Sequence, residues 1–459
     1  MYGMPLSQAL VFATSVVILL IATERWRFHP FLVIVAMASA FGLVAGYTTA
    51  QIAGVFGSGF SAMIYSPGLV IVAAALIAGL AEGTGASDRL KMLVKGRRWF
   101  SPRWTMSFFG LIAGAGSSPT STFAFLTPLL RPFGGDTAQS RERATVALAL
   151  AISSSHGLMF LAPVPIAAAA ILDAEWGRLA LFGVPLAFLL AAFAAIFAHW
   201  GSAFASFLPS PSQPSVAEVL SGEEKKGRGS PLVLVLATAI PLLLLMVQSI
   251  GDMPTEPLGG GPARELVLGI GRPLILLLVG VGIMSVGHLP QAFSRFANPA
   301  WIERVFGTVA GILLTACAAG GLQRLCQQTG MAEMVGERLA GWHAWPIGCV
   351  LVPFLVAAAM KTLQGSSLVA AITAAGIVHP ILPQLGLIDA NAKALAALAV
   401  GAGAMTASHV NDEYFWVVTQ SAGLRPLRGF FTVGLGTLLQ GFIAAAALLV
   451  ISLFVASST

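Results

Sequence analysis

The sequence predicts an all-α polytopic membrane protein with two inverted repeats, re-entrant hairpins and broken helices. Three observations lead to this class: the composition, recurring apolar runs, and polar breaks inside some of those runs. Of the 459 residues, 57% are hydrophobic and 10% are charged, whereas a soluble protein carries about 25% charged residues. Apolar runs of roughly 20 residues recur along the chain, and each is long enough to cross a bilayer.

The apolar runs divide the chain into two halves, 1–200 and 232–459. The expected spans lie near 8–24, 30–47, 67–83, 104–131 (broken), 143–166 (broken), 178–199, 232–250, 270–288, 305–325, 345–382 (broken), 392–420 (broken) and 430–455. Between the halves, 201–231 is rich in Pro and Ser and ends in a charged run, which is typical of a solvated linker. The first run lacks a basic segment before it and a clean cleavage site, so we interpret it as a retained span.

Basic loops predict the orientation. The loop 88–103 holds six basic residues against one acid, and loops with such an excess face the cytoplasm. Both termini are then periplasmic, and the linker is cytoplasmic. Arg131, Arg141 and Arg143 stay on the cytoplasmic side only if 104–131 enters the membrane and returns as a hairpin. The net charge of +6 therefore reports orientation, and no nucleic-acid partner is expected.

Three short matches relate the second half to the first. They pair Thr84-Gly85 with Thr329-Gly330, Gly116-Ser117-Ser118 with Gly365-Ser366-Ser367, and His156 with His409. The loop 331–344, which corresponds to 88–103, lacks the positive excess. This difference is expected if the second repeat is inverted, an architecture common among secondary transporters.

Two polar breaks beside glycines are candidate substrate-binding tips. Hydrocarbon cannot satisfy free backbone groups, so such breaks persist only inside protein or beside a wet cavity. Helix N-termini and hydroxyls there favour carboxylates, although hydroxyls also suit a small cation and small residues also serve close helix packing. The candidate residues are Ser117, Ser118, Thr120, Ser121, Gly365, Ser366, Ser367 and Thr373.

Ionisable and amide side chains near the breaks are further candidates, because such groups within a membrane tend to mark substrate or proton paths. His156 and Asn411 are assigned to substrate binding, as is Lys361, which either offsets a substrate carboxylate or snorkels to the interface. His409 and Asp412 are three residues apart, so on a helix they would share a face and form a proton-sharing pair, or else a silent structural pair.

Other chemistries have little support in the sequence. No Gly-x-x-x-x-Gly-Lys-Ser/Thr motif is present, which argues against ATP-driven transport. The three cysteines are too few for a disulfide framework, and a His-x-x-Asp pair alone makes a poor metal site. We therefore expect no metal and no cofactor.

Two segments carry a specific resemblance. Lys361-Thr-Leu-Gln-Gly-Ser-Ser-Leu-Val-Ala resembles the Arg-x-x-x-Gly-Ser-Ala-x-Val-Ala segment of the gluconate permease (GntP) family. Ser408-His-Val-Asn-Asp-Glu-Tyr-Phe-Trp416 resembles its Ser-His-Val-Asn-Asp-x-x-Phe-Trp signature, and His29-Pro-Phe-Leu also matches. In this chain Ser117–Thr122 replaces the aromatic-acidic run of the family's first hairpin, and lysine replaces the family's arginine.

The resemblance implies a proton symporter that imports gluconate or a related small hydroxylated carboxylate across the bacterial inner membrane, with H⁺ as coupling ion. We expect an elevator-type secondary transporter, not an enzyme, in which the hairpin-bearing part moves against a scaffold, and we expect a homodimer. The alternatives are sodium-coupled carboxylate transport, a passive channel, and a membrane-embedded metalloenzyme that uses His156, His409 and Asp412.

Overall fold

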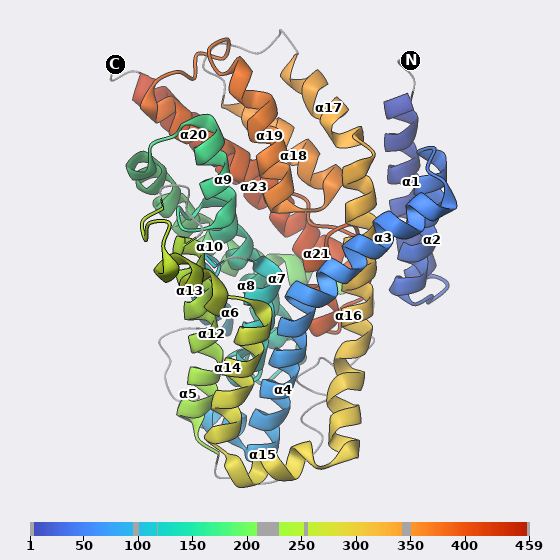
Figure 1. Cartoon of the computed structure of the whole chain (residues 1–459), viewed down its shortest axis with the longest axis vertical. Coiled ribbons are helices and arrows are strands. Elements are labelled where there is room, and N and C mark those ends of the chain that lie inside the picture. Colours follow the sequence, from blue (N-terminus) through green and yellow to red (C-terminus); the bar gives the residue numbers. More distant parts are fainter. Residues whose placement is uncertain are drawn as a thin grey trace.

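The computed structural model describes residues 4–94, 101–116, 118–208, 229–251, 256–341 and 350–456, and within these ranges it contains helices and no strand. The helices form a tall bundle, with the start of α1 and the end of α23 both towards its upper end (Figure 1). Six of the described helices are long and apolar enough to cross a membrane, or up to seven if one bent pair counts as a span. The chain is therefore a multi-pass membrane protein, as predicted.

The first half contains ten helices within its described residues. They are α1 (Met4–Glu24), α2 (Pro30–Val44), α3 (Thr49–Met63), α4 (Leu69–Thr84), α5 (Ala86–Val94), α6 (Pro102–Ala113), α7 (Pro119–Phe133), α8 (Ala138–Leu158), α9 (Pro163–Leu172) and α10 (Trp176–Phe204). The predicted span near 67–83 corresponds to α4, but the prediction missed that a π-helical turn, η1 (Ile64–Gly68), carries α3 into α4. Pro67 lies in this wide turn, which accommodates its missing N–H without ending the helix.

The second half is also built of helices. Its described helices are α12 (Pro231–Gly251), α13 (Pro262–Ile270), α14 (Pro273–Val286), α15 (Leu289–Phe296), α16 (Pro299–Gln328), α17 (Met331–Ala340), α18 (Leu351–Gln364), α19 (Ser367–Val378), α20 (Ala390–Ala404), α21 (Glu413–Ser421), α22 (Pro426–Gly429) and α23 (Leu435–Ala456). Short turns η2 (Ala205–Phe207) and η3 (His379–Ile381) follow α10 and α19, and the π turn η4 (Phe430–Gly434) joins α22 to α23.

All four predicted breaks are confirmed as interruptions between helices: α6 from α7, α8 from α9, α18 from α19, and α20 from α21. The predicted linker start at 201 is wrong, because α10 continues to Phe204 and η2 to Phe207. The rest of the predicted linker, 209–228, lies outside the described residues.

The first broken segment is a hairpin, as the charge pattern predicts. A Cβ on Gly135, just after α7, would lie 3.3 Å from Cγ of Pro102, the first residue of α6. At the same end, Lys91 of α5 pairs with Asp136 at 2.6 Å and Arg131 of α7 pairs with Asp88 at 3.1 Å. The end of α7 therefore returns to the level at which α6 begins.

The predicted match of Thr84-Gly85 with Thr329-Gly330 falls at two similar helix ends. Gly85 follows α4 with φ 76°, and Gly330 follows α16 with φ 65°. Glycine adopts this left-handed conformation without a Cβ clash, which makes it a common helix terminator. The hydroxyls of Thr84 and Thr329 each donate to a carbonyl of the preceding turn at 2.8 Å.

The two sequence halves interleave in space. Helices α3 and α4 of the first half pack against α16, α4 also packs against α14, and α9 packs against α19 and α20. Small residues permit close crossings between the halves, since a Cβ on Gly59 of α3 would lie 2.3 Å from the carbonyl oxygen of Gly320 of α16. The predicted boundary between halves is therefore not a boundary between two separate cores.

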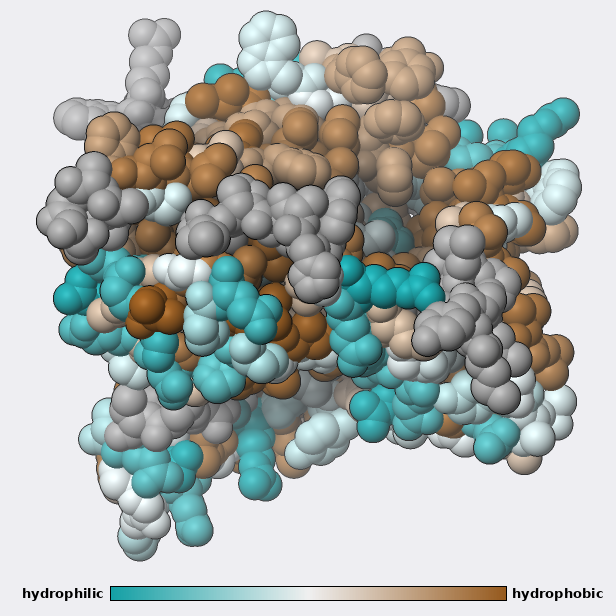
Figure 2. Space-filling model, turned by 90° about the horizontal axis from the view of Figure 1, so that it is seen from above, coloured by the Kyte–Doolittle hydropathy of each residue, from teal (hydrophilic) through white to brown (hydrophobic). Residues whose placement is uncertain are grey.

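The outer surface is rich in apolar side chains. In the view from above, hydrophobic residues reach the perimeter of the molecule at several places, and hydrophilic residues gather along one side (Figure 2). Exposed large apolar residues occur on α2, α10, α14 and α23, where Leu32, Leu181, Leu278 and Leu453 are each more than half exposed. Such a perimeter suits contact with lipid.

Candidate functional site

The four breaks meet at one cavity of about 170 Å³. Six of the predicted site residues line this cavity: Ser118, His156, Lys361, Ser366, Ser367 and Asp412. The two broken helices α8 and α20 cross beside it, where a Cβ on Gly401 would lie 2.1 Å from the carbonyl oxygen of Gly157. Because glycine has no side chain, the two backbones approach closely at this crossing. The end of α8, which contains His156, therefore lies next to the break after α20.

The two hairpin tips present the N-termini of helices to the cavity. Ser118 caps α7 by accepting from the amide of Ser121 at 3.4 Å, and Ser366 caps α19 by accepting from the amide of Val369 at 3.4 Å. Helix N-termini carry partial positive charge and free N–H groups, which favour a bound anion. The predicted residue Ser117 lies outside the described residues.

Lys361 forms a buried ion pair. Its Nζ donates to Asp412 Oδ2 at 2.6 Å and also contacts the carbonyl oxygen of Gly365, and both charged side chains are only 3–5% exposed. Ser408 donates to the same carboxylate oxygen at 2.6 Å, while Oδ1 accepts from the amide of Tyr414 at 3.0 Å. The snorkelling interpretation of Lys361 is therefore wrong, because the lysine joins the second hairpin tip to the break before α21.

His409 and Asp412 do not share a helical face, so that prediction is wrong. Helix α20 ends at Ala404, Ala407 has a left-handed φ of 48°, and Asp412 instead caps α21. Serine and aspartate side chains compete for backbone hydrogen bonds, which favours such a break over a continuous helix. His409 Nε2 contacts the carbonyl oxygen of Thr362 at 2.9 Å.

Asn411 and Gly365 hold the second tip in place. Asn411 donates to the Thr362 carbonyl at 3.0 Å. Gly365 has φ +83°, and a Cβ on it would lie 2.3 Å from the carbonyl oxygen of Asn411, so this turn requires glycine. Like His409, these two residues pack behind the tip and are not among those that line the cavity.

Three further predicted residues also lie away from the cavity lining. Thr120 and Ser121 are buried along α7, and Thr373 is partly buried on α19. Because a helix rotates by about 100° per residue, only the first positions after each tip face the cavity. Their assignment to substrate binding stays a prediction.

The sequence interpretation missed Glu413 and Tyr414, which line the cavity from the first turn of α21. Glu413 Oε2 accepts from Gln323 Nε2 of α16 at 3.2 Å, and the Tyr414 hydroxyl donates to the Ala149 carbonyl at 2.8 Å. An acid within an apolar region was itself a signal for Glu413.

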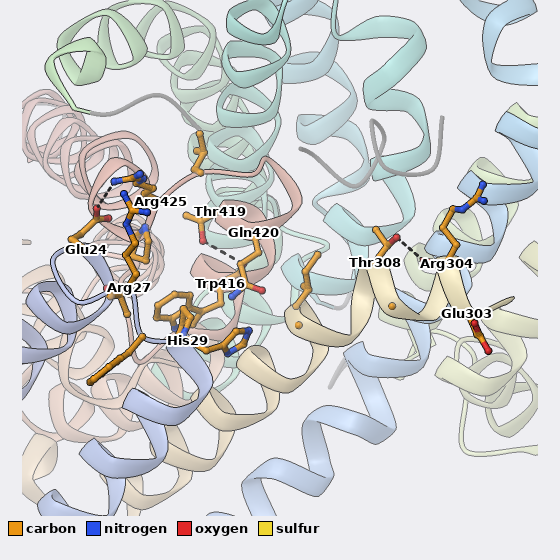
Figure 3. Close-up of a pocket in the computed structure, with 18 residues that line it drawn as sticks. Glu24, Arg27, His29, Glu303, Arg304, Thr308, Trp416, Thr419, Gln420 and Arg425 are labelled. Atoms are coloured by element: carbon orange, nitrogen blue, oxygen red, sulfur yellow. Dashed lines mark hydrogen bonds and ion pairs between the residues drawn. The ribbon is translucent and has the colours of Figure 1, made fainter. Parts of the chain in front are cut away.

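A second, larger cavity of about 740 Å³ contains none of the predicted binding residues. Figure 3 shows Glu24 pointing towards Arg425 at one end, a pair at 3.9 Å, while Glu303 and Arg304 lie towards the other end on α16. Trp416 and Gln420 line it from α21, the helix whose first turn lines the small cavity. Helix α21 thus contributes to both cavities.

The site contains no evident metal centre. Throughout the part of the chain that the structure describes, no group of three or more His, Cys, Asp or Glu side chains is arranged to hold a metal ion. The chemistry of the small cavity is that of hydroxyls, helix ends and a few charged groups, which suits reversible binding of a small polar molecule.

The chain is similar to a known protein family and to several known transporters. A family model described as GntP family permease matches residues 6–454. Gluconate permease of Pseudomonas aeruginosa is 26% identical over 92% of both chains. D-serine transporter DsdX of Escherichia coli K12 is 25% identical over 96% of this chain and 97% of its own, and the high-affinity gluconate transporter of the same strain is 26% identical over 89% and 90%.

Among solved structures, the YdaH transporter of Alcanivorax borkumensis aligns with 93% of this chain and 98% of its own. The TM-score is 0.37 and the identity is 13%.

Proposed function

The chain belongs to the GntP family of permeases, and we propose that it imports gluconate or a related small hydroxylated carboxylate across the bacterial inner membrane by proton symport. Because the family consists of permeases, the chain is a transporter and not an enzyme, and the metalloenzyme alternative is discarded. Relatives named for gluconate and for D-serine both support a small polar acid as substrate.

One observation carries the proposed substrate class: two capped helix N-termini, those of α7 and α19, meet at a single small cavity. A carboxylate between them would accept hydrogen bonds from free N–H groups on both sides. It would also lie near the partial positive charge of both helix N-termini. The hydroxyls of Ser118, Ser366 and Ser367 are then available to the hydroxyl groups of the substrate.

Competition for uptake tests this assignment. Unlabelled gluconate should suppress uptake of labelled gluconate, whereas glucose, which has similar hydroxyls but no carboxylate, should not. Ser366→Ala should weaken the apparent affinity, since it removes both a cap and a hydroxyl, with a cost of about 1 kcal/mol or roughly fivefold. Thr48→Ala, which removes the hydroxyl cap of α3 away from the cavity, is the matched control and should leave the affinity unchanged. Equal suppression by glucose and gluconate would refute an anionic substrate.

For the transport cycle we propose two inverted repeats whose hairpin-bearing part moves against a scaffold. Each half contains a long helix, a short helix, a hairpin, a broken helix and a final apolar helix in the same order. The short helices α5 and α17 lie near opposite ends of the molecule (Figure 1), which supports the inversion.

Cysteine labelling tests the inversion. Met92 on α5 and Glu337 on α17 are exposed, whereas the native Cys317 and Cys326 are buried. An impermeant thiol reagent applied outside intact cells should label Glu337→Cys, and Met92→Cys should react only after the membrane is opened. Labelling of both positions from the same side would contradict inverted repeats.

The larger cavity supports an aqueous route towards the cytoplasm. It is bordered by Arg27 and Arg425, which lie in short connections between helices, and basic residues in short connections favour the cytoplasmic side of a membrane. Sodium coupling remains the alternative to proton coupling. A homodimer, periplasmic termini and a coupling role for His409 and Asp412 remain predictions from the sequence.

A further inference from the structure

We infer that Glu413 carries the coupled proton, and that its protonation is what allows the small cavity to accept an anion. This inference rests on the proposed proton symport and identifies the group that performs it. It replaces the sequence-based assignment of the proton to His409 and Asp412 with a residue whose surroundings suit that role better.

The hydrogen bonds of the two adjacent carboxylates differ. Asp412 is fully engaged, since it accepts from Lys361, from the Ser408 hydroxyl and from the amide of Tyr414 at 2.6–3.0 Å. A proton on Asp412 would break the ion pair and leave the Lys361 charge buried without its partner. Asp412 is therefore suited to remain ionised throughout transport.

Glu413 has no such constraint. It lines the cavity, and its carboxylate accepts one hydrogen bond, at 3.2 Å, from the neutral amide of Gln323. Within the described residues, no cation lies within salt-bridge distance of it. Glu413 is partly buried. A carboxylate that is partly withdrawn from bulk water and lacks a cationic partner is neutralised by a proton at a lower energetic cost than an exposed one.

The other charged groups near Glu413 do not compensate for its charge. Lys361 and Asp412 neutralise each other in a direct ion pair at 2.6 Å, and His156 and Tyr414 also line the cavity. On the elements packed against α21, Arg428 of α22 is held by Glu142 of α8 through two hydrogen bonds of 2.9 Å. With Glu413 ionised and His156 neutral, the cavity therefore carries one net negative charge.

This net charge couples the binding of the proton to the binding of the substrate anion. An anion entering the cavity beside an ionised Glu413 would meet a like charge at close range in a medium of low dielectric constant. A proton from the outer solution that binds the Glu413 carboxylate removes this repulsion, and the anion then binds at the N-termini of α7 and α19. When the anion leaves into cytoplasmic water, the same proton is released there. Proton and anion binding therefore favour each other by the same factor.

The experiment uses the purified full-length chain in liposomes with labelled gluconate as the probe. Wild type, Glu413→Gln, Glu413→Asp and Glu337→Gln are compared, the last removing an exposed acid of α17 as control. Three quantities are measured: exchange of internal for external gluconate, accumulation on an imposed pH gradient, and proton uptake on adding gluconate. Gel filtration of each variant verifies the fold.

We expect Glu413→Gln to exchange gluconate at a rate independent of pH, but to accumulate none above equilibrium and to take up no protons. Wild type and Glu337→Gln should accumulate about tenfold per pH unit for one coupled proton. Glu413→Asp, which keeps the carboxylate, should retain proton uptake at a lower rate.

Three results would overturn the inference. If Glu413→Gln accumulates gluconate and takes up protons as wild type does, the proton is carried elsewhere. If Glu413→Gln, correctly folded, does not exchange gluconate, Glu413 contacts the substrate and is not the proton carrier. If wild type exchanges gluconate without proton uptake, the proposed symport itself fails, a result that the variants cannot produce.

Discussion

Replacing Lys361 with Met should destabilise the protein by about 3–5 kcal/mol and abolish gluconate exchange. The substitution leaves the Asp412 side chain, which is 5% exposed, buried without its cation. It also removes the link between the second hairpin tip and the break before α21, since Lys361 contacts both Gly365 and Asp412. Denaturant unfolding in detergent measures the first effect, and exchange in liposomes measures the second.

A double variant separates the charge effect from the loss of the side chain. Lys361→Met combined with Asp412→Asn removes both charges and should recover most of the lost stability, because no uncompensated charge remains buried. Lys91→Met breaks an exposed pair with Asp136 and serves as control, with an expected cost below about 1 kcal/mol. If Lys361→Met and Lys91→Met unfold alike, the buried pair is not a structural link.

Replacing Gly401 with Ala should disrupt the crossing of α8 and α20. The added methyl group would lie 2.1 Å from the carbonyl oxygen of Gly157, so one helix must move away from the other. Such overpacking costs about 1–3 kcal/mol, and the displaced helix ends reshape the cavity beside His156. We therefore expect a lower unfolding midpoint and at least a tenfold loss of exchange.

Gly376→Ala provides the control for this crossing. Gly376 lies within α19, and a Cβ there would meet no other atom within 4 Å. Alanine is the better helix former by about 0.5–1 kcal/mol, so this variant should be at least as stable as wild type. Equal effects of the two substitutions would show that helix propensity, and not the close approach of backbones, controls stability at position 401.

The class of the protein and the positions of its breaks could be predicted because both depend on local composition. A polar Gly-Ser-Ser break within apolar sequence is rare enough to identify the tips directly, and one serine of each predicted tip, Ser118 and Ser366, caps a helix. Helix continuity was harder to predict, since proline usually ends a helix and Pro67 does not.

The partners of charged residues could not be predicted, because they depend on distant parts of the chain. Lys361 and Asp412 are 51 residues apart, and Glu413 and Gln323 are 90 residues apart. Helical spacing suggested a pairing of His409 with Asp412, but the helix ends before both. Sequence periodicity applies only where the helix continues, and at a break the tertiary contacts determine which side chains meet.

The interleaving of α3 and α4 with α14 and α16, and of α9 with α19 and α20, has a consequence for assembly. A chain cut between α10 and α12 would leave two pieces, each exposing faces that only the other covers. Their folding would then become a bimolecular association whose completeness depends on the concentration of both pieces. The covalent connection from 209 to 228 makes this association intramolecular. It therefore keeps the effective concentration of each half near the other high during synthesis.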